Sequence, residues 1–166
     1  MYYLFILLVG VERVIELVVS RRNAAWSLAH GGKEFGRGHY PIMVNMHACL
    51  LVACIVEVWF LHRPFIPSLG WPMVAVVVLS TAVRWWCVAV LGKHWNPRLI
   101  VIPGAPLVRR GPYLWLHHPN YTAVIAEVAA LPLVHSAWLT AIGFSIANAL
   151  VLSGRIRAEN AVLGYT

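Results

Sequence analysis

Two polar clusters stand out in an otherwise apolar chain and hold the residue types that could do chemistry. The first is the stretch 92–119, GKHWNPRLIVIPGAPLVRRGPYLWLHHP, whose prolines and glycines favour a defined, non-helical path. The second is RIRAEN at 155–160, in which Arg155 and Glu159 are four residues apart. On a helix this spacing puts a cation and an anion on one face. Two interpretations stay open: an ion pair at a helix end, or a carboxylate that binds a cofactor beside a guanidinium that orients a reacting oxygen.

Histidines are frequent enough to raise the question of a metal centre. Five of them are predicted near one side of the molecule: His39, His47, His94, His117 and His118. No HxxxH or HExxH pair is present and the chain has no Asp, so the pattern lacks what a helical metal site needs. We therefore predict no metal or haem site. His118, which precedes a proline, is expected to make a single hydrogen bond at the start of a helix.

Composition decides the class of protein in which these clusters lie. Of 166 residues, 60% are hydrophobic and only 11% are charged, whereas an ordinary soluble domain has roughly a quarter charged. Four apolar blocks, residues 1–20, 41–61, 69–91 and 120–153, are long enough or nearly so to cross a bilayer core of about 30 Å. The fourth would reach roughly 50 Å as one straight helix. We expect Pro132 to break it into a hairpin whose second helix continues through 155–163.

The predicted fold is all-α: a polytopic membrane protein with five transmembrane helices, the last two forming a helical hairpin, in a single domain spanning 1–166. Residues 1–92 form a three-helix N-terminal part, and 93–166 hold the polar loop, the hairpin and the C-terminal helix. Ionisable residues within spans are costly in lipid and should form an interhelical network. They are Glu12, Arg13, Glu16, Glu57, Arg84 and Glu127. Arg84, near the end of its helix, is also placed to reach the pocket.

Basic residues predict the orientation of the chain, whose formal charge is +7. Ten of the 13 Lys and Arg are predicted on one side of the membrane, and only Arg63 is predicted on the opposite side. The other two, Arg13 and Arg84, lie within spans. By the positive-inside rule the basic side is cytoplasmic, which puts the pocket in the cytoplasm and the N-terminus outside. Nucleic-acid binding is not expected, because the basic residues lie in separate short loops. The ten residues on the basic side are Arg21, Arg22, Lys33, Arg37, Lys93, Arg98, Arg109, Arg110, Arg155 and Arg157.

The run PGAPLVRRGPYLWLHHPNY at 103–121 resembles the cofactor loop of the isoprenylcysteine carboxyl methyltransferase superfamily, which usually reads G-x-Y-x-x-x-R-H-P-x-Y. A helical hairpin and an R-x-x-x-E element follow in that family, here matched by the break at Pro132 and by Arg155 with Glu159. Two positions depart from the pattern: His117 stands where Arg is common, and Asn160 where a second Glu is common. The N-terminal half looks like the bacterial branch often found beside type III polyketide synthases. The similar runs are SRRNAAW, GGKEFGRGHYPIMVNMH and RWW with LGKHWNPRLIVIPG.

The resemblance implies an integral methyltransferase of a bacterial cytoplasmic membrane that uses S-adenosylmethionine without a Rossmann domain. Arg155 would be the catalytic residue that contacts the reacting oxygen of the substrate, and Glu159 would be catalytic as well as cofactor-binding. The implied substrate is a lipophilic small molecule, an alkylpyrone or alkylresorcinol, which would reach the site from the membrane lipids. A polyketide synthase is implied as a partner in the same pathway. The implied cofactor-binding residues are Ala105, Pro106, Leu107, Val108, Tyr113, His118, Pro119, Asn120, Tyr121 and Glu159.

Other functions fit the same residues less well. Carboxyl methylation of an isoprenylcysteine-like acid is the alternative within the enzyme class, because no sequence feature separates a phenol from a carboxylate. A non-enzymatic membrane protein, in which HHPNY and RIRAEN only stabilise loops, is the alternative outside it. A transporter has little support, because the sequence has neither an inverted repeat nor paired broken helices.

Overall fold

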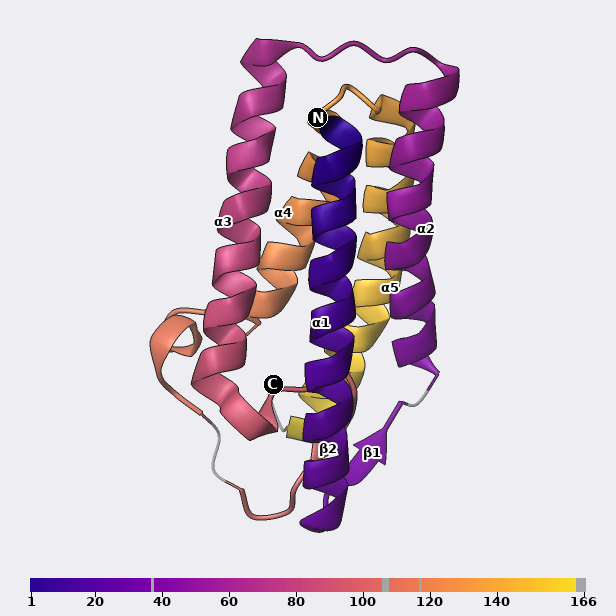
Figure 1. Cartoon of the computed structure of the whole chain (residues 1–166). Helices are drawn as coiled ribbons and strands as arrows, with labels where there is room; N and C mark the ends of the chain where they lie inside the picture. Colours follow the sequence, from indigo (N-terminus) through magenta and orange to yellow (C-terminus); the bar gives the residue numbers. More distant parts are fainter. Residues whose placement is uncertain (37, 106–107, 117, 164–166) are drawn as a thin grey trace.

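Five α-helices dominate the computed structural model, which describes residues 1–36, 38–105, 108–116 and 118–163 (Figure 1). Two three-residue strands, absent from the all-α prediction, pair antiparallel with Lys33 opposite Val101 and Phe35 opposite Leu99. We call this pair the ribbon. The elements in chain order are α1 (Tyr2–Ala29), β1 (Lys33–Phe35), α2 (His39–Phe60), α3 (Pro67–Leu91), η1 (Gly92–His94), β2 (Leu99–Val101), η2 (Gly111–Leu114), α4 (Pro119–Leu133) and α5 (Trp138–Leu163).

Helix α1 is longer than the predicted span of residues 1–20. It continues to its last residue, Ala29, because RRNAAWSLA at 21–29 is rich in good helix formers and has no glycine or proline. It ends where Gly31 takes a positive φ of 80° and the N–H of Gly32 donates to the Ser27 carbonyl at 2.9 Å. The first basic segment of the chain therefore starts on a helical extension and not in a loop.

The predicted break near Pro132 is confirmed. Helices α4 and α5 are separated by a short turn in which Ser136 has a positive φ of 56°. The N–H of Ala137 closes this turn by donating to the Pro132 carbonyl at 3.0 Å. The two helices form the expected hairpin, so the far end of α5 returns to the level at which α4 begins (Figure 1).

Glu57 of α2 caps the N-terminus of α5. Its carboxylate accepts hydrogen bonds from the backbone N–H groups of Leu139 at 3.2 Å and Thr140 at 2.7 Å, which have no partner within their own helix. Arg63 pairs with the same carboxylate at 2.8 Å. Glu57 therefore joins α2 to α5, as expected for an interhelical polar contact, and its pairing with Arg63 gives that basic residue a structural role at this end.

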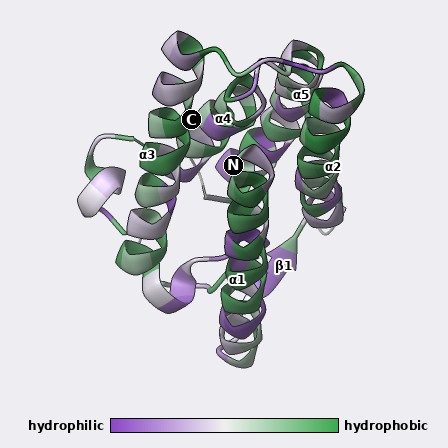
Figure 2. Ribbon diagram, turned by 45° about the horizontal axis from the view of Figure 1, so that its top comes forward, coloured by the Kyte–Doolittle hydropathy of each residue, from purple (hydrophilic) through white to green (hydrophobic). Residues whose placement is uncertain are grey.

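Hydrophobic side chains cover both the inside and most of the outside of the bundle. Helix α1 lies in front of α4 and between α3 and α2, while α5 lies behind α2 (Figure 1). Hydrophobic residues run along α2, α3 and the N-terminal half of α1 (Figure 2). Cys54, Val77 and Leu131 are fully buried in the core, whereas Leu79 and Leu150 are exposed on the outer surface. An apolar surface this extensive is unfavourable in water and suits a lipid environment.

Within the described residues, three helices are long and apolar enough to cross a membrane: His39–Phe60, Pro67–His94 and Trp138–Val162. The other two predicted spans differ from these. Helix α1 carries Glu12, Arg13 and Glu16 near its middle. Helix α4 has only 15 residues, about 22 Å at 1.5 Å per residue.

Five charged side chains join α1, α3 and α4 inside the bundle; we call Glu12, Arg13, Glu16, Arg84 and Glu127 the ion network. The Arg13 guanidinium lies 2.5 Å from Glu16, 2.7 Å from Glu127 and 3.0 Å from Glu12. Arg84 pairs with Glu16 and, at 3.4 Å, with Glu127. The predicted interhelical polar contacts are confirmed for these five residues, and Glu57 makes a separate one between α2 and α5. Charges in a low-dielectric interior need such pairing.

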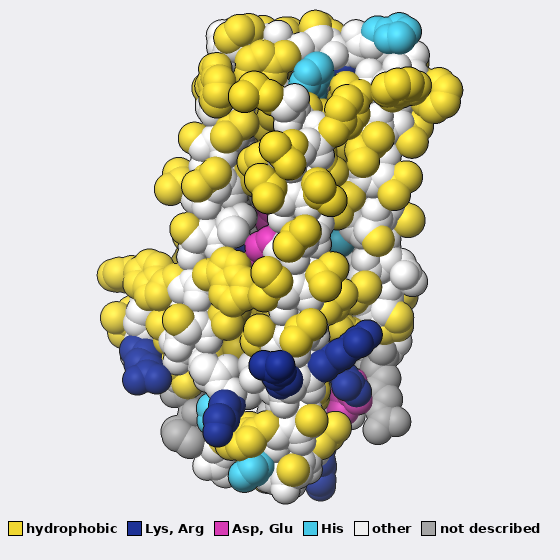
Figure 3. Space-filling model, in the orientation of Figure 1, with side chains coloured by type: hydrophobic (Ala, Val, Ile, Leu, Met, Phe, Trp, Pro, Cys, Tyr) yellow, Lys and Arg dark blue, Asp and Glu magenta, His cyan; other side chains and the backbone are white. Residues whose placement is uncertain are grey.

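The ribbon lies at one end of the bundle. On the face in Figure 3, Lys and Arg side chains gather at this end, and hydrophobic side chains cover most of the rest. Arg98, just before β2, holds Glu34 of β1 with two hydrogen bonds of 2.7 and 2.5 Å. These bonds raise the pKa of the Arg98 guanidinium, so the pair stays charged and ties the two strands together.

Candidate active site

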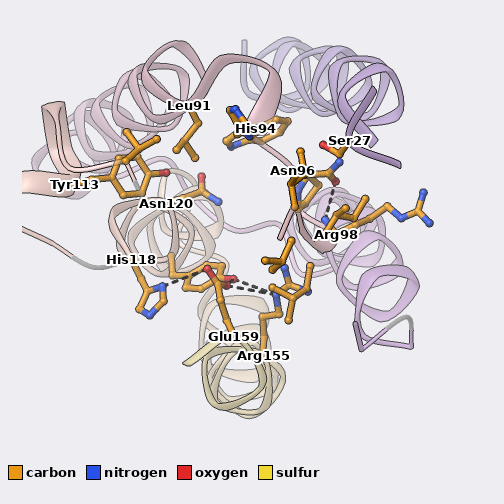
Figure 4. Close-up of a pocket in the computed structure, with 18 of the residues that line it drawn as sticks. Ser27, Leu91, His94, Asn96, Arg98, Tyr113, His118, Asn120, Arg155 and Glu159 are labelled. Atoms are coloured by element: carbon orange, nitrogen blue, oxygen red, sulfur yellow. Dashed lines mark hydrogen bonds and ion pairs between the residues drawn. The ribbon is translucent and has the colours of Figure 1, made fainter. Parts of the chain in front are cut away.

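A cavity of about 250 Å³ lies at the ribbon end of the bundle, and we call it the ribbon pocket. The start of α4, the C-terminal part of α5, strand β2 of the ribbon and the segment before β2 meet there. In Figure 4, Tyr113 and Asn120 lie on one side of the pocket, Arg98 lies on the other, and Glu159 and Arg155 line its floor. Segments far apart in the sequence thus supply facing walls.

The sequence HPNY at 118–121 builds the start of α4. Pro119 fits the first helical position, because that residue needs no partner for an N–H. The His118 ring lies just outside the helix, with Nε2 2.9 Å from Oδ1 of Asn160 and with its plane stacked on Tyr121. A hydrogen bond from His118 at a helix start, as predicted, is confirmed. The ring also comes within 3.7 Å of Glu159, so it links α4 to α5.

Tyr121 connects the two charged residues of α5 that the sequence singles out. Its hydroxyl donates to the Glu159 carboxylate and accepts a hydrogen bond from Nε of Arg155 at 3.1 Å. Arg155 and Glu159 themselves are 3.7 Å apart. Arg155 is only 3% exposed, although it lies near the end of a helix. The simple ion pair at a helix end is therefore part of a larger arrangement that crosses to α4.

A less polar wall is formed by the loop before α4. Ala105 and Val108 line the pocket there, together with Tyr113 of η2. Burial raises the pKa of the Tyr113 hydroxyl, so the ring offers a neutral surface with a polar tip. Pro106 and Leu107, which the sequence also assigns to this wall, lie outside the described residues.

Asn120 has a polar atom without a partner. Its Oδ1 is buried, and no described residue donates a hydrogen bond to it. Such an atom costs about 1–3 kcal/mol unless a bound molecule or water satisfies it. Asn120 lines the ribbon pocket, so the pocket offers an acceptor to a ligand that carries a donor.

The structure brings together all of the predicted site residues that it describes. All nine line the ribbon pocket: Ala105, Val108, Tyr113, His118, Pro119, Asn120, Tyr121, Arg155 and Glu159. Among the described residues, no group of three or more His, Cys, Asp or Glu is placed to hold a metal ion.

The facing wall comes largely from the polar stretch 92–119, which the sequence singles out as a whole without assigning Asn96 or Arg98 to the site. Trp95, Asn96 and Arg98 line it, and Ser27 of α1 joins them. Asn96 shapes this wall, because its Oδ1 accepts a hydrogen bond from the backbone N–H of Arg98 at 2.9 Å. The Asn-Pro pair at 96–97 is a turn signal in the sequence, but no local pattern brings Ser27 to it.

A helical bundle with an apolar outer surface, whose described residues include three helices long enough to cross a membrane, indicates an integral membrane protein, and the ribbon pocket lies at one end of this bundle. Residues 73–164, more than half of the chain, match the Isoprenylcysteine carboxyl methyltransferase (ICMT) family. This stretch begins within α3 and contains the nine described site residues and the hairpin. The chain belongs to that family, whose activity is methyl transfer at a membrane. The resemblance read from 103–121 and 155–159 is confirmed at this level.

Two bacterial proteins are similar over almost the whole chain. "Uncharacterized protein YpbQ" of Bacillus subtilis (strain 168) is 42% identical over 164 residues, covering 98% of this chain and 96% of that protein. An "Uncharacterized protein" of Haemophilus influenzae is 23% identical over 154 residues, covering 92% of this chain and 89% of that protein. The similarity therefore extends beyond residues 73–164 into the N-terminal helices.

Proposed function

We propose that this protein transfers a methyl group from S-adenosylmethionine to an oxygen atom of a lipid-tailed small molecule. The observation that carries the proposal is the convergence of the nine described residues in one pocket, with Tyr121 joining Arg155 to Glu159. Membership of a family of membrane methyltransferases supports the class of reaction. The alternative in which HHPNY and RIRAEN only stabilise loops is less favoured, because loop stabilisation needs no cavity beside them.

The residues of the ribbon pocket fit the polar groups of S-adenosylmethionine. Glu159 offers a carboxylate to ribose hydroxyls or to the amino group, and the buried Oδ1 of Asn120 offers an acceptor to a further donor. The start of α4 has the N–H groups and the positive dipole end that favour a carboxylate. The Tyr113 ring, with Ala105 and Val108, suits the adenine face. When bound, the sulfonium supplies an already activated methyl group.

The protein then contributes positioning, charge and the exclusion of water. Arg155 is held at its Nε by Tyr121, and no described residue accepts a hydrogen bond from its two terminal nitrogens. These nitrogens are free to orient the reacting oxygen and to favour its deprotonated form. Fixing the oxygen in line with the methyl group, in a site shielded from water, is the main catalytic requirement of such a transfer.

We also propose that all five helices span a bacterial cytoplasmic membrane, with the ribbon end in the cytoplasm and the N-terminus outside. The ion network removes much of the cost of the charges in α1, and neighbouring helices surround α4, most of whose first dozen residues are buried or half-buried. The Lys and Arg side chains at the ribbon end agree with the positive-inside rule (Figure 3).

The preferred acceptor is an alkylpyrone or alkylresorcinol, supplied by a polyketide synthase of the same pathway, and the alternative is an isoprenylcysteine-like carboxylic acid. The test is transfer of radiolabelled methyl groups from S-adenosylmethionine to both acceptors in parallel, using the detergent-purified protein. Transfer to the alkylresorcinol is the expected result. Transfer to the isoprenylcysteine alone would overturn the acceptor class, and transfer to neither by a folded sample that does not bind S-adenosylhomocysteine would overturn the activity.

A further inference from the structure

A second cavity, of about 230 Å³, lies between α1 and α2, and we call it the lateral pocket. Its outer walls are apolar and include Gly10 and Val14 of α1 and Ala48 and Leu51 of α2. Val14 is 59% exposed, so the cavity reaches the hydrophobic outer surface of the bundle. In a membrane, an alkyl chain in the surrounding lipid could enter here without crossing water.

Polar side chains line the inner end of the lateral pocket. Arg13, Glu16 and Arg84 of the ion network are there, together with His47 of α2. The network holds three carboxylates against two guanidiniums, and both guanidiniums are already paired with carboxylates. A carboxylate brought in by a ligand would therefore find no unpaired guanidinium there, whereas a neutral hydroxyl needs none.

His47 presents an unprotonated nitrogen to this end. Its Nδ1 lies 2.8 Å from the backbone carbonyl oxygen of Met43. A carbonyl only accepts hydrogen bonds, so Nδ1 of the neutral ring carries the proton and Nε2 holds the lone pair. Hence Nε2 is the nitrogen with which a ligand in the lateral pocket can interact. The charged groups that act on the ring are Arg13 and Glu127, both from the ion network.

The two cavities share a wall. Met43, Trp95, Pro97 and Asn120 line both the ribbon pocket and the lateral pocket. The unpartnered Oδ1 belongs to Asn120, on this wall. A polar head group at the inner end of the lateral pocket would therefore lie beside the ribbon pocket, where a methyl donor would bind.

We propose that the lateral pocket binds the acceptor of the methyl transfer, an amphipathic phenol or enol with an alkyl tail, and that Nε2 of His47 accepts its hydroxyl proton. The inference rests on the proposed function and deepens it by choosing a hydroxyl over a carboxylate. The tail lies between α1 and α2, and the hydroxyl lies beside His47. For Arg155 in the ribbon pocket to orient the same oxygen, the hydroxyl lies where the two pockets meet, at the residues that line both.

The step balances without a further reactant. The hydroxyl O–H bond breaks and its proton moves to Nε2, while the oxygen forms a bond to the methyl carbon. The carbon–sulfur bond breaks, and its electron pair stays on sulfur, which gives the neutral thioether S-adenosylhomocysteine. The resulting imidazolium then releases its proton to water. A general base of this kind typically contributes about 10²- to 10⁴-fold to the rate.

The first test needs no turnover. A 4-alkyl-2-nitrophenol, whose phenolate absorbs at longer wavelength than the phenol, is titrated into the S-adenosylhomocysteine complex. The unsubstituted protein is expected to bind it with the phenolate enriched, and His47→Gln is expected to bind it without that enrichment. His39→Gln, on the same helix but outside both pockets, is the matched control and should behave as the unsubstituted protein. Equal phenolate fractions in all three proteins would overturn the assignment.

The second test compares two acceptors with the same tail. A 5-alkylresorcinol is protonated at neutral pH, whereas a 4-hydroxy-6-alkyl-2-pyrone is already ionised and needs no base. His47→Gln should lower kcat/KM about 100-fold or more for the resorcinol and less than about tenfold for the pyrone. Equal losses for both, or none for the resorcinol, would overturn the role of His47 alone. An unsubstituted protein that binds S-adenosylhomocysteine but neither binds the nitrophenol nor methylates either acceptor would overturn the acceptor class as well.

Discussion

At the scale of single residues, the site depends on contacts between α4 and α5 that spacing alone does not contain. The sequence left two interpretations for Arg155 and Glu159. Tyr121 decides how they relate, because its hydroxyl lies between the guanidinium and the carboxylate. The motif residues 118–121 and 155–159 could be predicted because their order resembles that of a family. The stretch 92–119, which supplies Trp95 and Arg98, was singled out as well, but the approach of Ser27 could not be predicted, since only tertiary packing brings it to the pocket.

The proposed role of Arg155 predicts a split between binding and turnover. Arg155→Ala should leave the affinity for S-adenosylhomocysteine within about threefold and lower kcat by roughly 10- to 100-fold, the loss expected for one charged hydrogen bond of about 1.5–3 kcal/mol. Calorimetry and methyl-transfer assays measure the two quantities. Arg157→Ala, at an exposed position of the same helix, is the control. Normal turnover by Arg155→Ala would remove Arg155 from the reaction.

At the scale of elements, apolar length and proline predicted the helices, while their exact limits needed the structure. The hairpin at Pro132 follows from local rules, and so does the continuation of α5 past the apolar block. The extension of α1 through Ala29 was missed because the apolar block ends at residue 20. Residues 21–29 still have a high helix propensity, so the helix continues past that block. The strands KEF and LIV were missed because each is three residues long and pairs with a segment more than 60 positions away.

The cap of α5 predicts a stability effect remote from the site. Glu57→Gln keeps the shape of the side chain but removes the negative charge of the carboxylate that binds two backbone N–H groups and Arg63. The free energy of unfolding should fall by about 1–3 kcal/mol, seen as a lower Tm in detergent. The affinity for S-adenosylhomocysteine should not change. An unaltered Tm would mean that the carboxylate is dispensable for the cap, and Arg157→Gln serves as the exposed control.

At the scale of the whole molecule, the arrangement separates an apolar body from a basic, polar end. The hydrophobic surface runs along the helices, and Lys and Arg gather at one end (Figure 3). The ribbon (Figure 1) and the ribbon pocket lie at that end. A lipid-tailed acceptor could then keep its tail at the level of the apolar body while its head group approaches the polar end. This gives a physical reason for carrying out the reaction in a membrane protein.

The proposed orientation is testable by chemical labelling. In a background without Cys49, Cys54 and Cys87, one cysteine is introduced at His62, in the α2–α3 connection, and another at Lys93, at the ribbon end. Both positions are exposed. A membrane-impermeant maleimide should label the first in intact bacterial cells and the second only after the membrane is permeabilised. Labelling in the reverse order would invert the topology.

The central claim is that the ribbon pocket binds the methyl donor, and calorimetric titration with S-adenosylhomocysteine tests it most directly. The purified, folded protein should show saturable binding of one molecule per chain. Glu159→Gln should weaken that binding by at least about tenfold, the equivalent of one charge-assisted hydrogen bond, whereas Glu57→Gln, the same change at the opposite end of the bundle, should not. Absence of saturable binding to the folded protein, or equal affinities in all three proteins, would contradict the account.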